Sequence, residues 1–571
     1  MNFKQLESQV LSCVDSKLLM KHVEFISSFD RESGSIGEKR ATEYFDKTMK
    51  EYGLEAEVKY IENLISLPVS AEITLDNGKK LECITHSYAA STSKEGISAN
   101  AVFYPNTLDV NGKIAIINGL ASPAICYNLE RLGAIGVICI SGCEYPYNMA
   151  ISPIWGMPVP STVDLLGTIP VVTVNNINGD NLLNYINDEQ NIVNIVAEVD
   201  TKFRQVPLCI ADLKVNKDTD RYILFNGHVD AWHKGATDNG TSNAAILEIA
   251  RILKSFEDHL NVNIRFVWWS GHSNGRYSGS NWYADYNWQD IHENAIVNVN
   301  IDAIGAKGAT SYRHIESSAQ CYKLGFDVIK NLTSQEPKYA RIQRNGDQSF
   351  WGHGVPSLFE ILSLQPESTQ GKSTFVPGLP WYWHTVKDEF EQVGEEELKQ
   401  DTMIYLSSIL AFAAKPVFPF SYENLGSEML SNIDDCQAIA KESFDLSLIK
   451  NQIIRMKDLF IELDNEIARV NNMDNLSNND LCYALLLNNY LMELNRIVIP
   501  VHYCKSTPFE VDLALPVKPF PGLTDLEKLS QLNKDSFKFK ILERQLIREK
   551  NRIYHSFNDA IKLLTDIKSK R

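Results

Sequence analysis

The sequence predicts an α/β protein with an all-α C-terminal region. Residues 206–415 alternate β-type runs with amphipathic helical patterns, and residues 60–205 hold short β-type runs with few long helices. From residue 416 onward the chain is mostly amphipathic helix. A chain of 571 residues is too long for one hydrophobic core, so several domains are expected.

The N-terminal segment, residues 16–53, has a helical pattern with a loop at 33–37. Its second helix, over residues 38–52, should bury Ala41, Tyr44, Phe45, Met49 and Tyr52 on one side. Gly53 follows as a helix stop.

Residues 60–205 predict a small α/β insert. The expected strands lie at 113–117, 135–140 and 169–174, and the expected helices at 124–132 and 182–186. Two aromatic loops, 145–147 and 154–158, could line a cleft, but packing is the better interpretation for most of their rings.

In residues 206–415, three β-type runs are each followed by a possible metal ligand. His228 follows the run at 222–225, His272 follows 263–269, and Asp302 follows 295–301. A helix is expected over 241–256 and a further strand over 354–361. Open α/β sheets bind ligands at the carboxyl ends of their strands, and histidine with aspartate suits zinc and related metals.

The stretch 226–240 also holds Asp230, placed to hold the second ring nitrogen of His228, and Asp238 after a Gly-Ala-Thr turn. Taken alone, this stretch could equally be a polar turn with a hydrogen-bonded histidine.

Composition excludes some functions. A net charge of -17 argues against a nucleic-acid partner, since phosphate contacts require clustered Lys and Arg. Residues 1–21 lack the apolar core of a signal peptide, and no later segment is apolar over a length that could span a bilayer. Ten cysteines without a CxxC pair fit reduced thiols. We therefore expect a cytoplasmic protein that binds neither nucleic acid nor membrane.

The C-terminal region predicts helices over 428–500 and 525–571, separated by an irregular stretch at 500–522. Helical packing or dimerisation is its expected role, and its basic end is expected to be a solvated helix face.

Several motifs in order resemble one known family. They are Gly227-His228-Val229-Asp230, Gly235-Ala236-Thr237-Asp238, the loop Arg344-Asn345-Gly346-Asp347-Gln348-Ser349-Phe350, and His384-Thr385 followed by Asp388. The sequence thus resembles the co-catalytic zinc aminopeptidase and glutamate carboxypeptidase family, which also contains the transferrin receptor. The resemblance covers nearly the whole chain.

The resemblance implies a mixed central sheet flanked by helices, of the zinc exopeptidase type. It assigns residues 1–59 and 206–415 to a peptidase-like domain and 60–205 to a protease-associated insert. Residues 416–571 resemble the helical dimerisation domain, with weak support at 491–496 and 520–523, which implies a homodimer.

The resemblance also assigns ligands. His228 would bind one zinc, Asp238 would bridge two, Asp302 would complete the first site and His384 would bind the second, while Asp230 orients His228. One or two zinc ions are implied, and another divalent metal would also suit the site.

The chain departs from the family at one motif. Family enzymes carry a Glu-Glu pair that supplies a general base and a ligand, whereas no acidic residue stands between Trp269 and Ser280 here. We expect His272 to take the ligand position, because neutral imidazole binds zinc well. The general base is unassigned, with Asp230, Glu360 and Glu367 as remote candidates.

These observations predict a metal-dependent hydrolase that cleaves an amide bond in a peptide or a small amino-acid-derived or N-acyl substrate. Arg276, Tyr382 and Trp383 are the expected substrate contacts, with Trp381 shaping the pocket, although Arg276 could instead form a structural ion pair. His233 and His353 are expected either to contact the ligand residues from behind or to be structural. The alternative is a catalytically impaired binding or scaffold protein.

Overall fold

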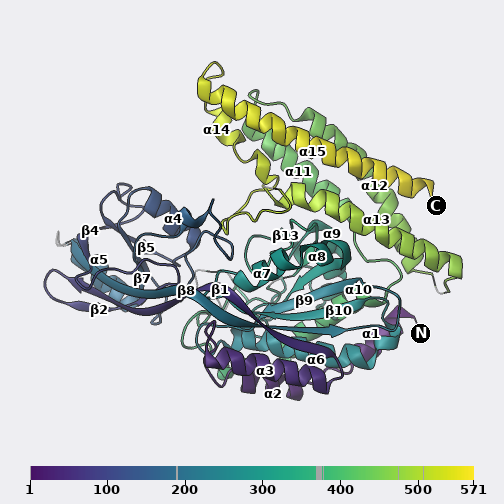
Figure 1. Cartoon of the computed structure of the whole chain (residues 1–571), viewed down its shortest axis with the longest axis horizontal. Coiled ribbons are helices and arrows are strands. Elements are labelled where there is room, and N and C mark those ends of the chain that lie inside the picture. Colours follow the sequence, from purple (N-terminus) through teal and green to yellow (C-terminus); the bar gives the residue numbers. More distant parts are fainter. Residues whose placement is uncertain are drawn as a thin grey trace.

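The computed structural model describes residues 2–187, 191–359, 361–367, 376, 378–473, 475–505 and 507–570. Figure 1 shows a central sheet with its helices, a helical C-terminal domain above it and an insert projecting to one side. Two long antiparallel strands, β1 (Glu55–Leu75) and β8 (Ile192–Leu213), run from the central domain into the insert.

The central domain is built on a mixed sheet, as predicted. Its strand order is β13-β12-β14-β11-β9-β10-β8. Strands β9, β10, β11 and β14 run parallel, whereas β8 is antiparallel to β10. The bounds are β9 (Tyr222–His228), β10 (Asn263–Trp269), β11 (Ala295–Asn300), β12 (His314–Ser317), β13 (Lys338–Arg341) and β14 (Ser357–Leu358). The strand expected over 354–361 is therefore only two residues long.

Side chains of the central strands alternate between two cores. On β9, Ile223 and Phe225 join the larger hydrophobic cluster, whereas Tyr222 and Leu224 join the cluster on the opposite face. Helices cover both faces, so these strands are apolar along their length. One face packs against α1 (Phe3–Leu11), α2 (Ser16–Ile26), α3 (Ile36–Glu51), α6 (Thr241–Ser255), α9 (Ala319–Thr333) and α10 (Glu395–Ala414); the other packs against α7 (Ser278–Tyr286) and α8 (Trp288–Asn294).

Helix α3 shows how local sequence sets an element. Ser35 accepts a hydrogen bond from the Glu38 amide and caps the helix, and Gly53 follows its last turn in a left-handed conformation. Ala41, Phe45 and Met49 are buried as predicted, while Tyr44 and Tyr52 are partly buried.

The insert contains a parallel sheet of β4 to β7, with short strands beside it. Its elements are β2 (Lys80–Glu82), β3 (Ile84–Thr85), β4 (Ile97–Phe103), β5 (Ile114–Asn118), β6 (Gly136–Ile140), β7 (Val171–Val174), α4 (Pro123–Arg131) and α5 (Asn176–Asn187). The expectation of short strands throughout is wrong for β1 and β8, which are 21 and 22 residues long. The predicted boundaries at residues 60 and 205 fall inside these two strands, so a continuous ribbon joins the insert to the central sheet.

The C-terminal domain is helical, with bounds α11 (Tyr422–Ala440), α12 (Ser447–Asn471), α13 (Asn478–Tyr503), α14 (Leu526–Ser530) and α15 (Phe537–Ser569). Helix α13 contains Pro500, so the irregular stretch begins after Tyr503 rather than at 500. Arg496 fixes this domain to the central one by donating to the backbone oxygens of His292, Gly354 and Ala295 at 2.6, 2.8 and 2.6 Å.

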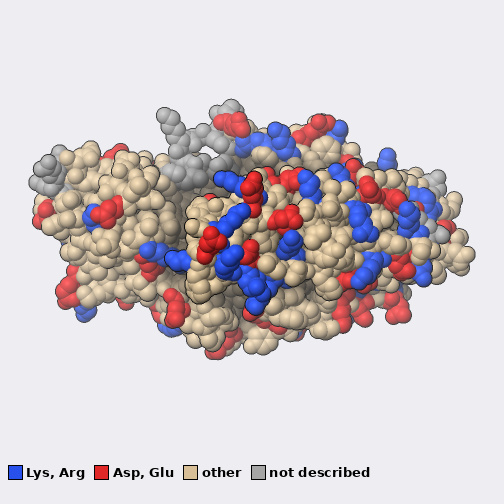
Figure 2. Space-filling view, turned by 90° about the horizontal axis from the view of Figure 1, so that it is seen from above, with Lys and Arg blue, Asp and Glu red and all other residues tan. Residues whose placement is uncertain are grey.

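Charges of both signs are interspersed over the face of the helical domain seen in Figure 2. On α15, Arg552 pairs with Glu549 at 2.9 Å and Lys562 with Asp559 at 2.8 Å, while Lys568 reaches Glu462 of α12 at 2.8 Å. Among the described helices, none combines the length and apolar character that crossing a bilayer requires.

The N-terminal segment braces the loop that follows β9. The buried Arg31 guanidinium donates to the backbone oxygens of Val229, Ile26 and Gly235 at 3.0, 2.8 and 2.9 Å, and also to that of Lys234. Burial lowers the pKa of Arg31 to about 10, which still leaves the side chain charged at neutral pH. One side chain therefore ties the loop to the end of α2.

We predict that Arg31→Ala destabilises the central domain by at least about 3 kcal/mol, because it leaves several buried carbonyl groups without a donor. Denaturant unfolding followed by tryptophan fluorescence measures this. Lys39→Ala is the control: its side chain is 54% exposed, and a surface change of this kind costs about 0.5 kcal/mol or less. Equal unfolding midpoints for the two variants would contradict the bracing role of Arg31.

Candidate metal centre

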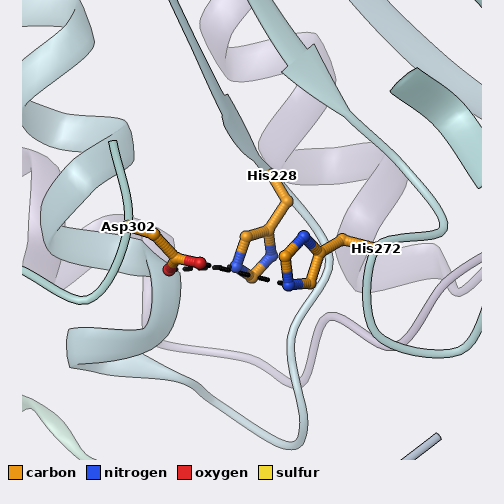
Figure 3. A group of neighbouring side chains, drawn as sticks. All are labelled: His228, His272 and Asp302. Carbon is orange, nitrogen blue, oxygen red and sulfur yellow. Dashed lines mark hydrogen bonds and ion pairs between the residues drawn. The ribbon is translucent and has the colours of Figure 1, made fainter. Parts of the chain in front are cut away.

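Three parallel strands end at one edge of the sheet, and each brings one polar side chain there. Strand β9 ends at His228, β10 ends at Trp269 before the loop that carries His272, and β11 ends at Asn300 shortly before Asp302. The possible ligand atoms of His228, His272 and Asp302 all lie within 4.8 Å of one another (Figure 3). The convergence expected from the strand ends is therefore present.

Asp238 lies between two histidines. Its Oδ1 is 3.1 Å from His228 Nε2, and its Oδ2 is 3.1 Å from His384 Nε2. Asp302 Oδ1 lies 3.3 Å from the same His228 nitrogen. A tetrahedral zinc ion with bonds of ~2.0 Å holds its ligand atoms ~3.3 Å apart. His228 Nε2 thus faces one carboxylate oxygen of Asp238 and one of Asp302, and Asp238 faces both histidines with different oxygens.

A tight turn and a second carboxylate hold Asp238. Gly235 has a φ of +46°, and a Cβ there would meet the Asp238 backbone oxygen at 2.1 Å, so the turn requires glycine. Asp388 accepts hydrogen bonds from the Thr237 amide, the Thr237 hydroxyl and the Asp238 amide at 2.8, 2.8 and 2.9 Å. Asp388 therefore orients the ligand candidate through its backbone.

Backbone carbonyl groups set the tautomers of two histidines. His228 Nδ1 lies 2.7 Å from the backbone oxygen of Asp230, and His384 Nδ1 lies 2.8 Å from that of Asn148 in the insert. A carbonyl oxygen only accepts, so Nδ1 carries the hydrogen and Nε2 keeps a lone pair facing Asp238.

Asp230 differs in detail from its expected role. Its backbone oxygen, rather than its carboxylate, contacts the His228 ring; the nearest carboxylate oxygen is 3.8 Å from Nδ1. The carboxylate instead accepts from the Ser33 hydroxyl at 2.5 Å and from the amides of His272 and Ser273 at 3.2 and 2.9 Å. It therefore orders the loop after β10.

The electrostatics of the group call for a cation. Burial opposes protonation of His228, but Asp302 and Asp238 outweigh burial and raise the pKa of its imidazole well above the usual range. Burial favours neutral Asp238, yet hydrogen bonds with His228 and His384 hold the pKa of its carboxyl well below the usual range. Without a metal, a proton on His228 Nε2 supplies the positive charge between this nitrogen and the two carboxylates, and a divalent ion would take the place of that proton. These donors fit a divalent metal.

The ring of His272 lies against the ring of the ligand candidate His228. The two rings stack with centroids 3.7 Å apart and planes 10° apart. The two rings therefore lie face to face, while His272 still belongs to the group of possible ligand atoms that also holds His228 and Asp302.

Asp347 holds the His272 ring from behind. Its Oδ2 is 2.9 Å from His272 Nδ1, and its Oδ1 accepts from the Ser280 hydroxyl at 2.6 Å. Asp347 is fully buried. The pair leaves His272 Nε2 facing the metal centre, 4.0 Å from Asp302 Oδ2.

The three predicted substrate contacts, Trp383, Tyr382 and Arg276, differ in burial and in their hydrogen-bond partners. Trp383 is half-buried and stacks on His384 with ring centroids 3.5 Å apart. Tyr382 is buried, and its hydroxyl donates to the Gln392 backbone oxygen at 3.3 Å. Arg276 donates to the Tyr277 hydroxyl at 3.0 Å and to the Ala514 backbone oxygen at 3.3 Å. Within the described ranges no carboxylate lies at ion-pair distance from Arg276.

The remote base candidates that the structure describes, Asp230 and Glu367, are held by other groups. Glu367 is exposed and pairs with Arg313 at 2.7 Å, and the Asp230 carboxylate is occupied as described. Glu360 lies outside the described residues. His233 contacts the Asn148 side chain at 2.7 Å, and His353 contacts the Ala284 backbone oxygen at 3.0 Å.

Two contributors were missed at the sequence level, Asp347 and Asn148. Asp347 lies in the quoted loop 344–350, so its motif was a usable signal. Asn148 acts through its backbone oxygen, a contact that no residue type reveals.

Comparisons with known proteins agree with this geometry. Residues 209–408 match the model described as peptidase family M28. A maize protein named "Probable glutamate carboxypeptidase VP8" is 22% identical over 367 residues, which cover 58% of this chain and 49% of that protein. The chain thus spans about half the length of this relative.

Two further relatives carry different names. "Aminopeptidase YwaD" of Bacillus subtilis is 25% identical over 65% of this chain and 78% of its own length. A Schizosaccharomyces pombe protein named "Inactive zinc metalloprotease C354.09c" is 22% identical over 50% of this chain and 35% of its own.

Among solved structures, the aminopeptidase from Aneurinibacillus sp. strain AM-1 superimposes with a TM-score of 0.54 at 21% identity, over 71% of this chain and 96% of that protein. Likeness at this identity establishes the fold. The match to the family model thus lies within the central domain, and the insert and the C-terminal helices lie outside the matched residues.

Proposed function

We propose that this protein is a metal-dependent hydrolase that cleaves an amide bond in a peptide or a small amino-acid-derived or N-acyl substrate. The observation that carries the proposal is the three-donor group of His228, Asp238 and Asp302 at the strand edge, with donor contacts of 3.1 and 3.3 Å. Three protein ligands with a position left for water or substrate is the arrangement of catalytic zinc sites. When bound, zinc or a similar divalent ion polarises the carbonyl and lowers the pKa of water to ~7.

We expect one tightly held metal. The second histidine, His384, has Asp238 as its carboxylate partner, and no further acidic ligand candidate lies beside this pair among the described residues. Loss of the family's ligand glutamate removes one negative charge, which weakens binding of a second ion.

His272 is the proposed general base. Its Nε2 faces the centre, and Asp347 accepts from Nδ1–H at 2.9 Å, so the lone pair of the neutral ring is on Nε2. His272 takes the proton of the attacking water at Nε2 and delivers it to the leaving amine, while Asp347 stabilises the imidazolium. This pair would replace the missing glutamate.

Substrate contacts follow from the surroundings. Trp383 presents a half-buried ring beside His384, suited to an apolar group, and Arg276 offers a guanidinium near the His272 loop, suited to a carboxylate. Activity screens across aminoacyl, N-acyl and γ-glutamyl amides with several metals would identify the substrate class.

A second candidate is a binding or scaffold protein. The absence of the Glu-Glu pair and the relative named inactive favour it. Retention of His228, Asp238, Asp302 and His384 with ordered tautomers favours the hydrolase, because a scaffold does not need converging donors. A protein without bound zinc, and without stabilisation by zinc, manganese or cobalt, would rule out the hydrolase.

We predict that His228→Ala loses zinc and that His384→Ala retains most of it. The first change removes a donor from the three-donor group, whereas the second leaves that group intact. Elemental analysis after dialysis measures the zinc bound per protein chain. His314→Ala, at an exposed position on β12, is the control and should match the wild type. Full zinc retention by His228→Ala would contradict the assigned site.

For the base, we predict that His272→Gln lowers kcat by ~10²–10⁴-fold at unchanged zinc content, since it removes positioned proton transfer. Asp347→Asn should lower kcat less. The control is Asp285→Asn, which changes an exposed residue on α7 whose carboxylate accepts from the Asn281 side chain at 3.3 Å. If His272→Gln loses zinc as His228→Ala does, then His272 is a ligand after all.

We also propose a homodimer through the C-terminal domain and a cytoplasmic location. Exposed leucines on α13 support the dimer: Leu481, Leu485 and Leu486 are 46%, 61% and 36% exposed. The unpaired state of all ten cysteines supports a reducing compartment.

The dimer predicts that Leu481→Glu with Leu485→Glu yields a monomer, because two charges would be buried in the interface. Light scattering after size exclusion measures the mass. Ile36→Glu, which changes an 81% exposed apolar residue on α3, should leave the mass unchanged. A monomeric wild type at micromolar concentration would refute the dimer.

A further inference from the structure

Trp155 of the insert is buried where three domains meet. It is 2% exposed and forms a small cluster with Tyr277 of the central domain and Ala514 of the C-terminal domain. Backbone hydrogen bonds fix its loop from both sides: Gly156 donates to the Arg276 oxygen at 2.7 Å, and Ala514 donates to the Pro153 oxygen at 2.8 Å. The ring therefore occupies a fixed position beside the loop after β10.

One route from Trp155 to the centre is a column of rings. Trp155 stacks on Tyr277 with centroids 4.2 Å apart and planes 27° apart. Tyr277 meets His272 edge-on at 4.8 Å and 86°. His272 in turn stacks on His228 at 3.7 Å. The rings confine His272 between Tyr277 and a ligand candidate.

The second route is a chain of hydrogen bonds. Trp155 Nε1 donates to Ser349 Oγ at 2.8 Å, Ser349 Oγ lies 2.9 Å from Ser280 Oγ, and Ser280 Oγ donates to Asp347 at 2.6 Å. Asp347 then meets His272 Nδ1 at 2.9 Å.

The donor at Trp155 sets the direction in which each hydrogen bond of this series is donated. An indole N–H can only donate, so Ser349 accepts it and keeps its own hydrogen for Ser280. Ser280 likewise accepts from Ser349 and directs its hydrogen to the carboxylate, which is a charge-assisted bond. Ser280 Oγ also lies 3.2 Å from the Tyr277 oxygen, a longer contact than the one to Asp347. Each hydroxyl in the chain thus stabilises the Asp347 anion that holds His272.

We propose that Trp155 is a positioning residue that couples docking of the insert to the orientation of His272. Both routes start at the same ring, one acting on the face of His272 through Tyr277 and the other on its Nδ1 through Asp347. The catalytic consequence rests on the proposed role of His272 as general base, whereas the effect on the orientation of the ring does not.

The experiment compares Trp155→Phe, Ser349→Ala and Tyr185→Phe in the zinc-loaded full chain. Trp155→Phe keeps a stacking ring and removes the N–H donor, and Ser349→Ala removes one link. Tyr185→Phe is the control in the same insert, where its hydroxyl bonds the Ile192 backbone oxygen at 3.0 Å, away from the centre. The readouts are zinc content, kcat and KM, and the rate at which diethyl pyrocarbonate modifies His272, followed by peptide mass spectrometry.

We expect both test variants to keep their zinc, to lower kcat by about tenfold with KM within about twofold, and to speed modification of His272 at least about threefold, within the range typical of lost supporting contacts. Tyr185→Phe should match the wild type in each readout. An unchanged His272 modification rate in both test variants would overturn the proposal. Faster modification with unchanged kcat, together with an active His272→Gln enzyme, would instead refute the general-base role and leave the positioning role standing.

Discussion

The candidate site depends on one electrostatic arrangement, in which two buried carboxylates face a single imidazole nitrogen. Asp238 and Asp302 both lie within 3.3 Å of His228 Nε2, in a region that burial deprives of solvent screening. Such a group is costly without a cation, and a bound metal supplies the positive charge. The surrounding residues hold the donors rigidly: Asp388 fixes the Asp238 turn, Arg31 ties the preceding loop, and Asn148 sets the tautomer of His384.

The loop after β10 changes the balance of charge in this centre. No acidic residue stands between Trp269 and Ser280, so Asp238 and Asp302 are the carboxylates of the proposed donor set. Asp347 returns a negative charge, but behind His272 and not toward the metal. A carboxylate there fixes a neutral imidazole and stabilises it when it takes a proton, the task that the proposed mechanism requires. The loop that lacks the glutamates thus carries His272, and Asp347 lies beside this histidine and can stabilise its protonated form.

Much of the centre could be predicted because its signals are local. His228 and Asp238 sit in a short motif, Asp302 follows a buried strand, and parallel strands bring their carboxyl ends to one edge. The stacking of His272 on His228 could not be predicted, since residue type says nothing about the angle between two ring planes. The long strands β1 and β8 were also missed. They contain Pro68 and Pro207 and many half-exposed residues, so their pattern does not read as strand until each pairs with the other.

The α/β class followed from the sequence pattern, and the mixed sheet and four of the candidate ligands, His228, Asp238, Asp302 and His384, followed from the family resemblance. These features depend on hydrophobic periodicity and on motifs a few residues long, both of which can be seen in the sequence before the chain folds. The tautomer of His384, the orientation of His272 and the place of Trp155 depend on Asn148, Asp347 and Ser349, which come from other parts of the chain. Such contacts arise only when distant segments pack together, because hydrogen bonds and ring stacking act over a few ångströms and depend on direction.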